Sequence, residues 1–90
     1  MLELKQTTQF KKDLKQIIKR GFPIEQLDGI ITSLRQRKPL EQKHRDHALS
    51  GEFSGFRECH IRPDWLLVYW IDDDRLVLTA VRTGSHSDLF

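Results

Sequence analysis

The hydrophobic residues in the first part of the chain change from strand spacing to helix spacing. Leu2 and Leu4 alternate with polar residues, which predicts a short strand over residues 1–6 at or near a sheet edge. One of the threonines at positions 7–8 is suited to cap the helix that follows. The apolar residues of this helix repeat at i, i+4, i+7 and i+8, and they are Phe10, Leu14, Ile17 and Ile18. Gly21 comes just after them and indicates the end of the helix.

A second helix is predicted to open at Phe22-Pro23 and to end near Arg37, because Pro39 cannot continue it. Its apolar residues also keep helical spacing, and they are Ile24, Leu27, Ile30, Ile31 and Leu34. We expect the two helices to form a hairpin that lays both apolar stripes on one face of a sheet. Residues 38–55 show no convincing period, and a connection of this length is usually functional or disordered. Ala48-Leu49 is expected to tether it to the core.

From Phe56 onward the period is that of strands. Residues 56–61 alternate, with Glu58 and His60 on one face. Residues 65–71 are apolar on both faces, which predicts a central strand. After an acidic turn, residues 75–82 return as a strand that a glycine then breaks. The order predicts an α+β fold: an N-terminal strand, a helical hairpin, then a three-stranded antiparallel meander, with the helices on one sheet face and the other face partly open.

Length and composition restrict the class of protein. Ninety residues support one domain over residues 1–90, with apolar content for one core. The single cysteine, Cys59, excludes an intramolecular disulfide and fits a reducing compartment. The longest apolar run is far shorter than the ~20 residues that span a bilayer. We therefore expect a cytoplasmic protein with no membrane partner.

Charge is distributed unevenly along the chain. Residues 1–47 hold 11 Lys or Arg against 6 Asp or Glu, and residues 48–90 hold 4 against 7. The basic half favours an anionic partner, of which nucleic acid is the commonest. The alternative is that lysines on helix surfaces serve solubility. No P-loop, G-x-G-x-x-G, G-x-S-x-G or zinc-type cysteine pair occurs, so nucleotide hydrolysis, dinucleotide chemistry and zinc-finger binding lack support.

Candidate chemistry is concentrated from residue 44 onward, where all four histidines lie: His44, His47, His60 and His86. A hairpin would bring residues 60–65 and 82–90 to the same end of a sheet. Imidazoles exchange protons near neutrality, with an unperturbed pKa of ~6.5. With Asp64 and nearby arginines they suit cleavage of an RNA phosphodiester, which needs a base, an acid and cations around the phosphate. No metal or cofactor is required, because the 2′-hydroxyl of RNA is the nucleophile.

Each of these residues also has a purely structural interpretation. His60 on a strand fits a half-buried structural histidine, and His47 fits packing as well as catalysis. His44 lies in a polar loop and fits a solvated or phosphate-contacting residue. Asp64 beside a proline fits a turn. Phe90 fits either an anchor for the tail around His86 or a platform that stacks on a base.

A metal site is the competing chemistry. The pair His44-x-x-His47 together with His60 and Asp64 offers nitrogen and oxygen ligands for zinc or nickel. The spacing is not a strong metal signature, so we predict no metal ligands.

Three motifs together resemble a known family. They are Asp46-His47-x-Leu49-x-Gly51, then Gly55-x-Arg57-x-x-His60-Ile61-x-Pro63-Asp64-Trp65 with Tyr69, then Arg82-x-Gly84-x-His86-x-x-Leu89-Phe90. This pattern closely resembles the YafQ branch of the RelE/ParE toxin superfamily. The first 45 residues match in layout alone. Other RelE-like branches place Lys, Arg and Tyr at the site in place of the histidines.

The resemblance implies a type II toxin–antitoxin toxin with a RelE-like fold. Such a toxin is an mRNA interferase, a ribosome-dependent endoribonuclease that cleaves messenger RNA in the A site by metal-independent acid–base catalysis and inhibits translation. The implied partners are a cognate antitoxin and mRNA on the ribosome, with 16S rRNA contacts through the basic helices and loop. DNA would be contacted only through the antitoxin, in an autoregulatory complex.

The resemblance also implies roles for single residues. The positions expected to carry activity are His47, His60, Asp64, Arg82 and His86. The positions expected to contact substrate are Arg57, Arg62, Lys43, His44, Arg45 and Phe90. We predict His86 as general acid, Asp64 or His60 as general base, His47 as a partner that orients or charges the site, and Arg82 as stabiliser of the transition state. Asp64 meets the objection that a carboxylate is a weak base unless burial raises its pKa.

The alternative function is a non-catalytic toxin of the same fold that acts by binding a partner such as DNA gyrase. ParE-like members of the superfamily act in this way. The four histidines argue against it, because poisoning gyrase needs no acid–base group.

Overall fold

A computed structural model of the chain describes all 90 residues. Its elements are β1 (Glu3–Gln6), α1 (Thr8–Lys19), α2 (Ile24–Arg35), the short 3₁₀ helix η1 (Gln42–His44), β2 (His47–Ala48), the 3₁₀ helix η2 (Gly51–Phe53), β3 (Arg57–Arg62), β4 (Trp65–Asp72), β5 (Val77–Gly84) and α3 (His86–Leu89). The helical hairpin, the strand before it and the meander after it are all confirmed. None of the helices has the length and apolar character needed to cross a membrane.

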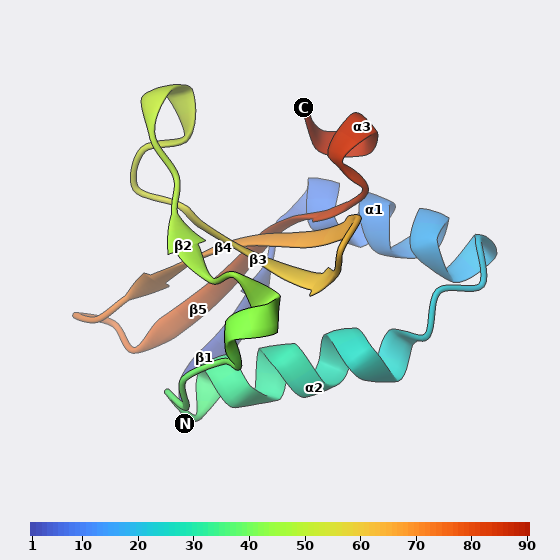
Figure 1. Ribbon diagram of the computed structural model, residues 1–90. Coiled ribbons are helices and arrows are strands. Elements are labelled where there is room, and N and C mark those ends of the chain that lie inside the picture. The colour runs from blue at the N-terminus through green and yellow to red at the C-terminus, as the bar shows by residue number, and fades with distance from the viewer.

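The five strands form one mixed sheet in the order β1-β5-β4-β3-β2. β1 runs parallel to β5, and every other neighbouring pair is antiparallel. The predicted central strand, β4, is the middle strand, and the predicted edge strand, β1, is at an edge. In Figure 1 helix α2 lies below the sheet, while α3 and the loop that holds η2 rise on the opposite side. The α+β architecture is therefore as expected.

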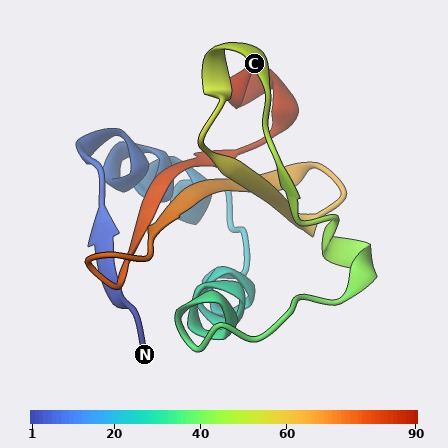
Figure 2. The same ribbon diagram turned by 90° about the vertical axis from the view of Figure 1, so that its left-hand side faces the viewer.

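Helix α1 packs beside β5 (Figure 2), and this position determines which of its residues are buried. The side chain of Thr7 caps the helix by accepting a hydrogen bond from the N–H of Phe10, and its hydroxyl donates to the Val81 carbonyl at 2.8 Å. Phe10 is buried as predicted. The prediction for Ile18 was wrong, because 54% of this residue is exposed. Asp13 is buried in its place.

Helix α2 supplies the lower wall of the core. It ends at Arg35, and Pro23 stands at its N-cap, one position outside the first turn that we expected. Its buried residues are Leu27, Ile30, Ile31 and Leu34. They join a single cluster with residues of α1 and of the three long strands, among them Cys59, Ile61, Trp65, Leu67, Tyr69 and Leu78. The alternation predicted for β3 is confirmed, since Cys59 and Ile61 face this core while Glu58 and His60 take the other positions.

Two regular segments differ from the sequence prediction. The connection after α2 contains a two-residue strand, β2, that pairs with β3. The strand expected over residues 75–82 instead spans Val77–Gly84, because the turn before it is longer. The Asp72 carboxylate accepts the backbone N–H groups two and three residues further on, which keeps this segment turned. Leu76 consequently has a positive φ of 57° and is exposed rather than on the strand's buried face.

The segment after β5 is a short helix, α3, where we expected a turn and a tail. Ser85 is its N-cap and forms a capping box with Asp88, in which each side chain accepts a hydrogen bond from the other residue's backbone N–H. This box is what begins the helix immediately after the strand. His86 is its first residue, so a potential catalytic group sits on a defined element.

Candidate active site

Three imidazoles lie in a row on the sheet face opposite the core. They belong to His47 of β2, His60 of β3 and His86 of α3. The ring centroids of His47 and His60 are 6.3 Å apart, and those of His60 and His86 are 5.5 Å apart. His47 on β2 pairs with Glu58 on β3, two residues before His60. His86 is on α3, which follows β5, and β5 is separated from β3 by β4 alone. Three of the predicted catalytic residues are therefore neighbours.

A buried carboxylate lies between two of these rings. Glu58 is 6% exposed, and its Oε1 is 3.4 Å from His60 Nε2 and 3.9 Å from His47 Nε2. Glu58 was not among the predicted site residues. The signal was available, because the alternation on β3 puts Glu58 on the same face as His60.

Hydrogen bonds to backbone carbonyls assign a proton to Nδ1 of both His47 and His60. His47 Nδ1 faces the carbonyl oxygen of Arg45, which only accepts, so Nδ1 carries the proton and Nε2 keeps a lone pair. His60 Nδ1 is 3.2 Å from the Pro63 carbonyl oxygen, and its Nε2 faces Glu58. The Pro63 carbonyl only accepts, so Nδ1 of His60 carries its proton, and the 3.4 Å between Nε2 and Glu58 Oε1 is an ion-pair distance.

Asp64 is arranged to orient His86. Its Oδ1 accepts hydrogen bonds from the backbone N–H of His86 at 3.0 Å and from His86 Nδ1 at 2.6 Å. These two bonds, the backbone one foremost, hold the pKa of Asp64 below its usual value. Its side chain is 70% exposed. The burial that would make Asp64 a useful base is absent, so this geometry disfavours the prediction of Asp64 as general base.

Arg82 is fixed by a partner on α1. Its Nε donates to Asp13 Oδ2 at 2.7 Å and its Nη2 to Asp13 Oδ1 at 3.1 Å, while the Thr83 N–H also donates to Oδ2. Burial alone would raise the pKa of Asp13, but the hydrogen bonds from Arg82, Gln9 and Thr83 outweigh it and the pKa is lowered. The guanidinium of Arg82, on β5, is therefore held against α1.

Phe90 and Arg45 lie near the row of imidazoles, while Lys43 lines two cavities, one of them on the helix side of the sheet. Lys43 and Arg45 line a cavity of about 290 Å³ whose other walls are His60 and Pro63. Phe90 is 57% exposed and packs edge-to-face on Phe53 of η2, with ring centroids 5.2 Å apart. An exposed aromatic pair at this place fits a base-stacking platform at least as well as an anchor.

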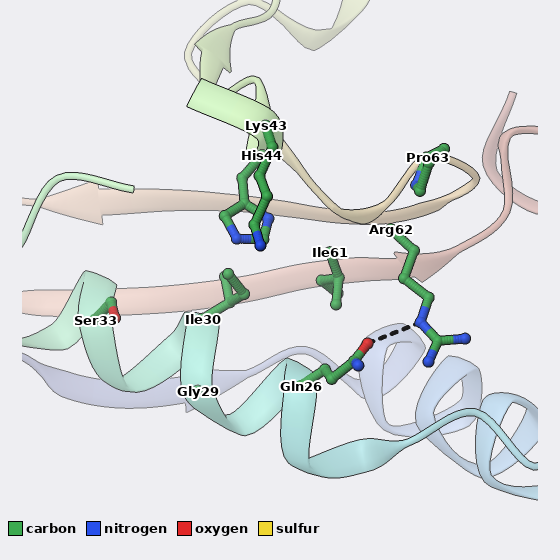
Figure 3. Close-up of a pocket in the computed structure, with 9 residues that line it drawn as sticks. All are labelled: Gln26, Gly29, Ile30, Ser33, Lys43, His44, Ile61, Arg62 and Pro63. Carbon is green, nitrogen blue, oxygen red and sulfur yellow. Dashed lines mark hydrogen bonds between the residues drawn. The ribbon is translucent and has the colours of Figure 1, made fainter. Parts of the chain in front are cut away.

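Three other predicted substrate contacts point to the helix side of the sheet. Arg57 Nε is 3.3 Å from both Asp46 Oδ1 and the Tyr69 hydroxyl, beneath β3. The remaining two, His44 and Arg62, line a hollow of about 550 Å³ between α2 and β3. Figure 3 shows the side chains of Lys43 and His44 reaching towards α2 and Arg62 bonded to Gln26. His44 Nδ1 donates to the backbone carbonyl of His60 at 2.7 Å, on the opposite side of the strand from the imidazole row. Their roles in substrate binding remain predictions.

A different set of residues from the one we considered is suited to a metal ion. Ligand atoms of Glu58, His60 and His86 all lie within 4.8 Å of one another. Two imidazole nitrogens and a carboxylate oxygen suit zinc, copper or nickel. The set that combined His44 with His47, His60 and Asp64 was wrong, because His44 lies on the helix side of β3.

The chain is similar over its whole length to known proteins. Residues 2–90 match the model of a family described as "Bacterial toxin of type II toxin-antitoxin system, YafQ". An Escherichia coli K12 protein named "mRNA interferase toxin YafQ" is 35% identical over 89 residues, which cover 98% of this chain and 95% of that protein. Two solved structures share the fold over at least 99% of each chain: a metal-bound toxin from Helicobacter pylori, with 44% identity and a TM-score of 0.95, and the toxin in the E. coli DinJ-YafQ complex, with 34% identity and a TM-score of 0.89.

Proposed function

The chain belongs to the YafQ family of bacterial type II toxins, and from this we propose that it is a ribosome-dependent endoribonuclease that cleaves messenger RNA in the A site. The observation that carries the proposal is the row of three imidazoles flanked by two carboxylates. A toxin that only bound gyrase would have no use for such a row. The E. coli relative named an mRNA interferase supports the same class of reaction.

The reaction is an in-line transfer within the RNA chain. A base removes the proton of the 2′-hydroxyl, the O2′ forms a bond to phosphorus, and the bond from phosphorus to the 5′-oxygen breaks. An acid then gives the departing 5′-oxygen its proton, which leaves a 2′,3′-cyclic phosphate and a 5′-hydroxyl. Each proton transfer contributes ~10²–10⁴-fold to the rate.

His86 is the general acid. It is 54% exposed at its side chain, so its Nε2 is open to substrate while Nδ1 is bonded to Asp64. The carboxylate fixes the orientation of the ring that must deliver the proton. This is the role a buried aspartate has behind a catalytic histidine in serine hydrolases. Asp64 is accordingly a partner of the acid and not the base.

His47 is the general base. Its Nδ1–H donates to the Arg45 carbonyl, which leaves the Nε2 lone pair free to accept a proton. We had expected His60 or Asp64 in this role and His47 as the charged partner. We assign His60 the charged role instead, because its Nε2 lies 3.4 Å from Glu58 Oε1 and an imidazolium paired with that carboxylate contributes positive charge beside the phosphate.

Cations complete the site. Arg45 beside His60 attracts the phosphate backbone of the RNA, and Arg82 stabilises the charge that develops on the phosphate. The other basic residues of the first half contact ribosomal RNA. The partner that controls the toxin is an antitoxin, as DinJ is for the E. coli toxin, and any DNA contact is made through that antitoxin.

The test is 5′-end mapping of a reporter mRNA after brief expression of the wild-type chain, of His86→Ala and of Ser87→Ala. Ser87 is an exposed neighbour on α3 and serves as the matched control. We expect discrete cuts in phase with codons for wild type and Ser87→Ala, and none for His86→Ala. Intact mRNA with arrested growth in both wild type and His86→Ala would exclude the nuclease and leave a binding toxin, with gyrase as the next target.

A second candidate function, binding of a transition-metal ion, rests on the cluster of Glu58, His60 and His86. The metal-bound relative from Helicobacter pylori supports it. A bound ion would take the nitrogen lone pairs of His60 and His86, so it would compete with catalysis. Calorimetric titration with Zn²⁺ should give one site per chain, weakened at least tenfold in Glu58→Gln. Cleavage should persist when EDTA removes transition metals under an excess of Mg²⁺, which the ribosomes need. Loss of cleavage in EDTA would contradict the metal-independent mechanism.

A further inference from the structure

The helix that carries His86 is too short to hold its own position. α3 has four residues, and isolated helices shorter than ~12–15 residues are marginal in water. It has no buried residue that would fix it to the core. Apart from the half-buried Leu89 and the packing of Phe90 on Phe53 just beyond the helix, the orientation of His86 comes from the polar contacts that α3 makes with the rest of the chain.

Two of these contacts lie within the segment or under His86 itself. The Ser85–Asp88 capping box closes the helix, and Asp64 accepts two hydrogen bonds from His86. Gly84 allows the tight entry, because a Cβ there would come within 3.0 Å of Asp88. These contacts shape the helix and bind its first residue, but none of them ties the helix to α1.

A third contact comes from the far end of α1. Arg20 Nη1 donates to Asp88 Oδ2 at 2.7 Å and Arg20 Nη2 to Asp88 Oδ1 at 2.9 Å, a bidentate pair. Arg20 is the C-cap of α1, with its N–H bonded to the Gln16 carbonyl, so its backbone is fixed to a helix of 12 residues that packs against β5. The guanidinium keeps the pKa of Asp88 far below its usual value, so the pair stays charged.

We propose that Arg20 is a positioning residue for His86: through its bidentate pair with Asp88 it locks α3 against α1 and aims the imidazole at the substrate. The inference rests on the proposed function, since it assigns Arg20 a part in that reaction. Asp64 fixes one side of the short helix and Arg20 the other. With both in place the ring of His86 has one orientation relative to the row of imidazoles.

The rival role for Arg20 is a direct contact with RNA phosphate. The two roles predict opposite effects for Asp88→Asn. This variant keeps a side-chain oxygen for the Ser85 N–H but weakens the pair with Arg20. A positioning role makes Asp88→Asn as harmful as Arg20→Gln, whereas a phosphate contact is released by it and binding improves.

The experiment is single-turnover cleavage of mRNA on programmed ribosomes, with toxin in excess and its concentration varied. Mg²⁺ is kept in excess over EDTA, so that the chelator removes transition metals while the ribosomes stay assembled. The variants are Arg20→Gln, Asp88→Asn, the double variant and Arg20→Lys. Asp73→Asn is the matched control, because it weakens another exposed Arg–Asp pair, of 2.6 Å, at the opposite end of the sheet. Each variant is first shown to unfold in urea as wild type does, as expected for exposed ion pairs, which contribute little to stability.

We expect the maximal rate to fall by roughly tenfold to a hundredfold in Arg20→Gln and Asp88→Asn, as for other misplaced catalytic groups, with the half-saturating toxin concentration unchanged. The double variant should be no slower than either single one. Arg20→Lys should recover part of the rate, since lysine gives one bond to Asp88 where arginine gives two. Asp73→Asn should cleave as wild type.

Amide hydrogen exchange of residues 85–90 supplies a readout independent of cleavage. Exchange should accelerate in Arg20→Gln and Asp88→Asn and stay unchanged in Asp73→Asn. A wild-type maximal rate in Arg20→Gln overturns the inference, and so does a loss confined to the half-saturating concentration, which assigns Arg20 to RNA binding. If wild type itself does not cleave, the proposed function fails and the catalytic role of Arg20 fails with it, even where exchange confirms the contact.

Discussion

Replacing Asp13 with alanine tests whether one buried carboxylate holds α1 against the sheet. Asp13 is 9% exposed and accepts hydrogen bonds from the Arg82 guanidinium, from the Thr83 N–H at 3.2 Å and from Gln9. The contacts with Arg82 and Thr83 join residues about 70 positions apart. Without the carboxylate, Thr83 loses the acceptor of a buried N–H, and Arg82 loses its only ion-pair partner.

The size of the effect follows from burial. Thr83 is 1% exposed, so leaving its N–H without an acceptor costs about 1–3 kcal/mol. The Arg82 side chain is 32% exposed, so water replaces much of its bond and the loss is about 1 kcal/mol. Alanine returns about 0.5 kcal/mol through its higher helix propensity. The free energy of unfolding should therefore fall by about 2–3 kcal/mol.

The assay is urea unfolding followed by tryptophan fluorescence. Trp65 is a direct reporter, because its indole N–H donates to the Thr83 hydroxyl at 3.0 Å. Asp13→Asn should lose less than Asp13→Ala, since one amide oxygen remains to accept. Asp28→Ala, which removes an exposed carboxylate from α2, is the control and should change little. A change below about 0.5 kcal/mol in Asp13→Ala would refute the argument that this carboxylate is a structural tie.

Acid should weaken the fold. The pKa values of Asp13 and Asp88 are lowered from 3.8, so the stability they contribute is complete above that value and is lost as the pH falls through their folded pKa values; the free energy of unfolding should be smaller at pH 3 than at pH 6. Burial raises the pKa of the Cys59 thiol, so its reaction with a thiol reagent at pH 8 should be no faster than unfolding, and rapid native labelling would contradict this. Tyr69→Phe removes the hydroxyl that donates to Asp46 and should cost about 1 kcal/mol in the same urea assay, with an unchanged midpoint as the contrary result.

Local periodicity was sufficient for the type and order of the main elements, but not for the parallel pairing of β1 with β5. The two apolar stripes and the alternation on β3 predict helices, strands and the buried side of each. The exception on α1 has a non-local cause, because Asp13 is buried only where Arg82 and Thr83 reach it from β5. No window of the sequence around Asp13 contains that information.

The site was predicted in part. Its three imidazoles were identified by residue type, and Glu58 was missed although its position in the alternation put it beside His60. Alternation also placed Arg57 on the opposite face, which its bond to the Tyr69 hydroxyl bears out. The direction of His44 was beyond prediction, since it depends on how η1 turns the chain back under β3. The capping-box pattern Ser85-x-x-Asp88 is present in the sequence and predicts α3, although we did not use it.

The parallel pairing of β1 with β5 has a consequence for how the chain acquires its fold. The residues that this pairing joins are 74 positions apart. The helical hairpin is synthesised early, yet its apolar stripe has no partner until β3, β4 and β5 exist. Closing so long a loop has an entropic cost that nothing repays in advance, so folding should be slow for a chain of this size and should finish in one late step. Until that step, the hairpin is exposed to proteases and chaperones, and they compete with the completion of the sheet for every new molecule.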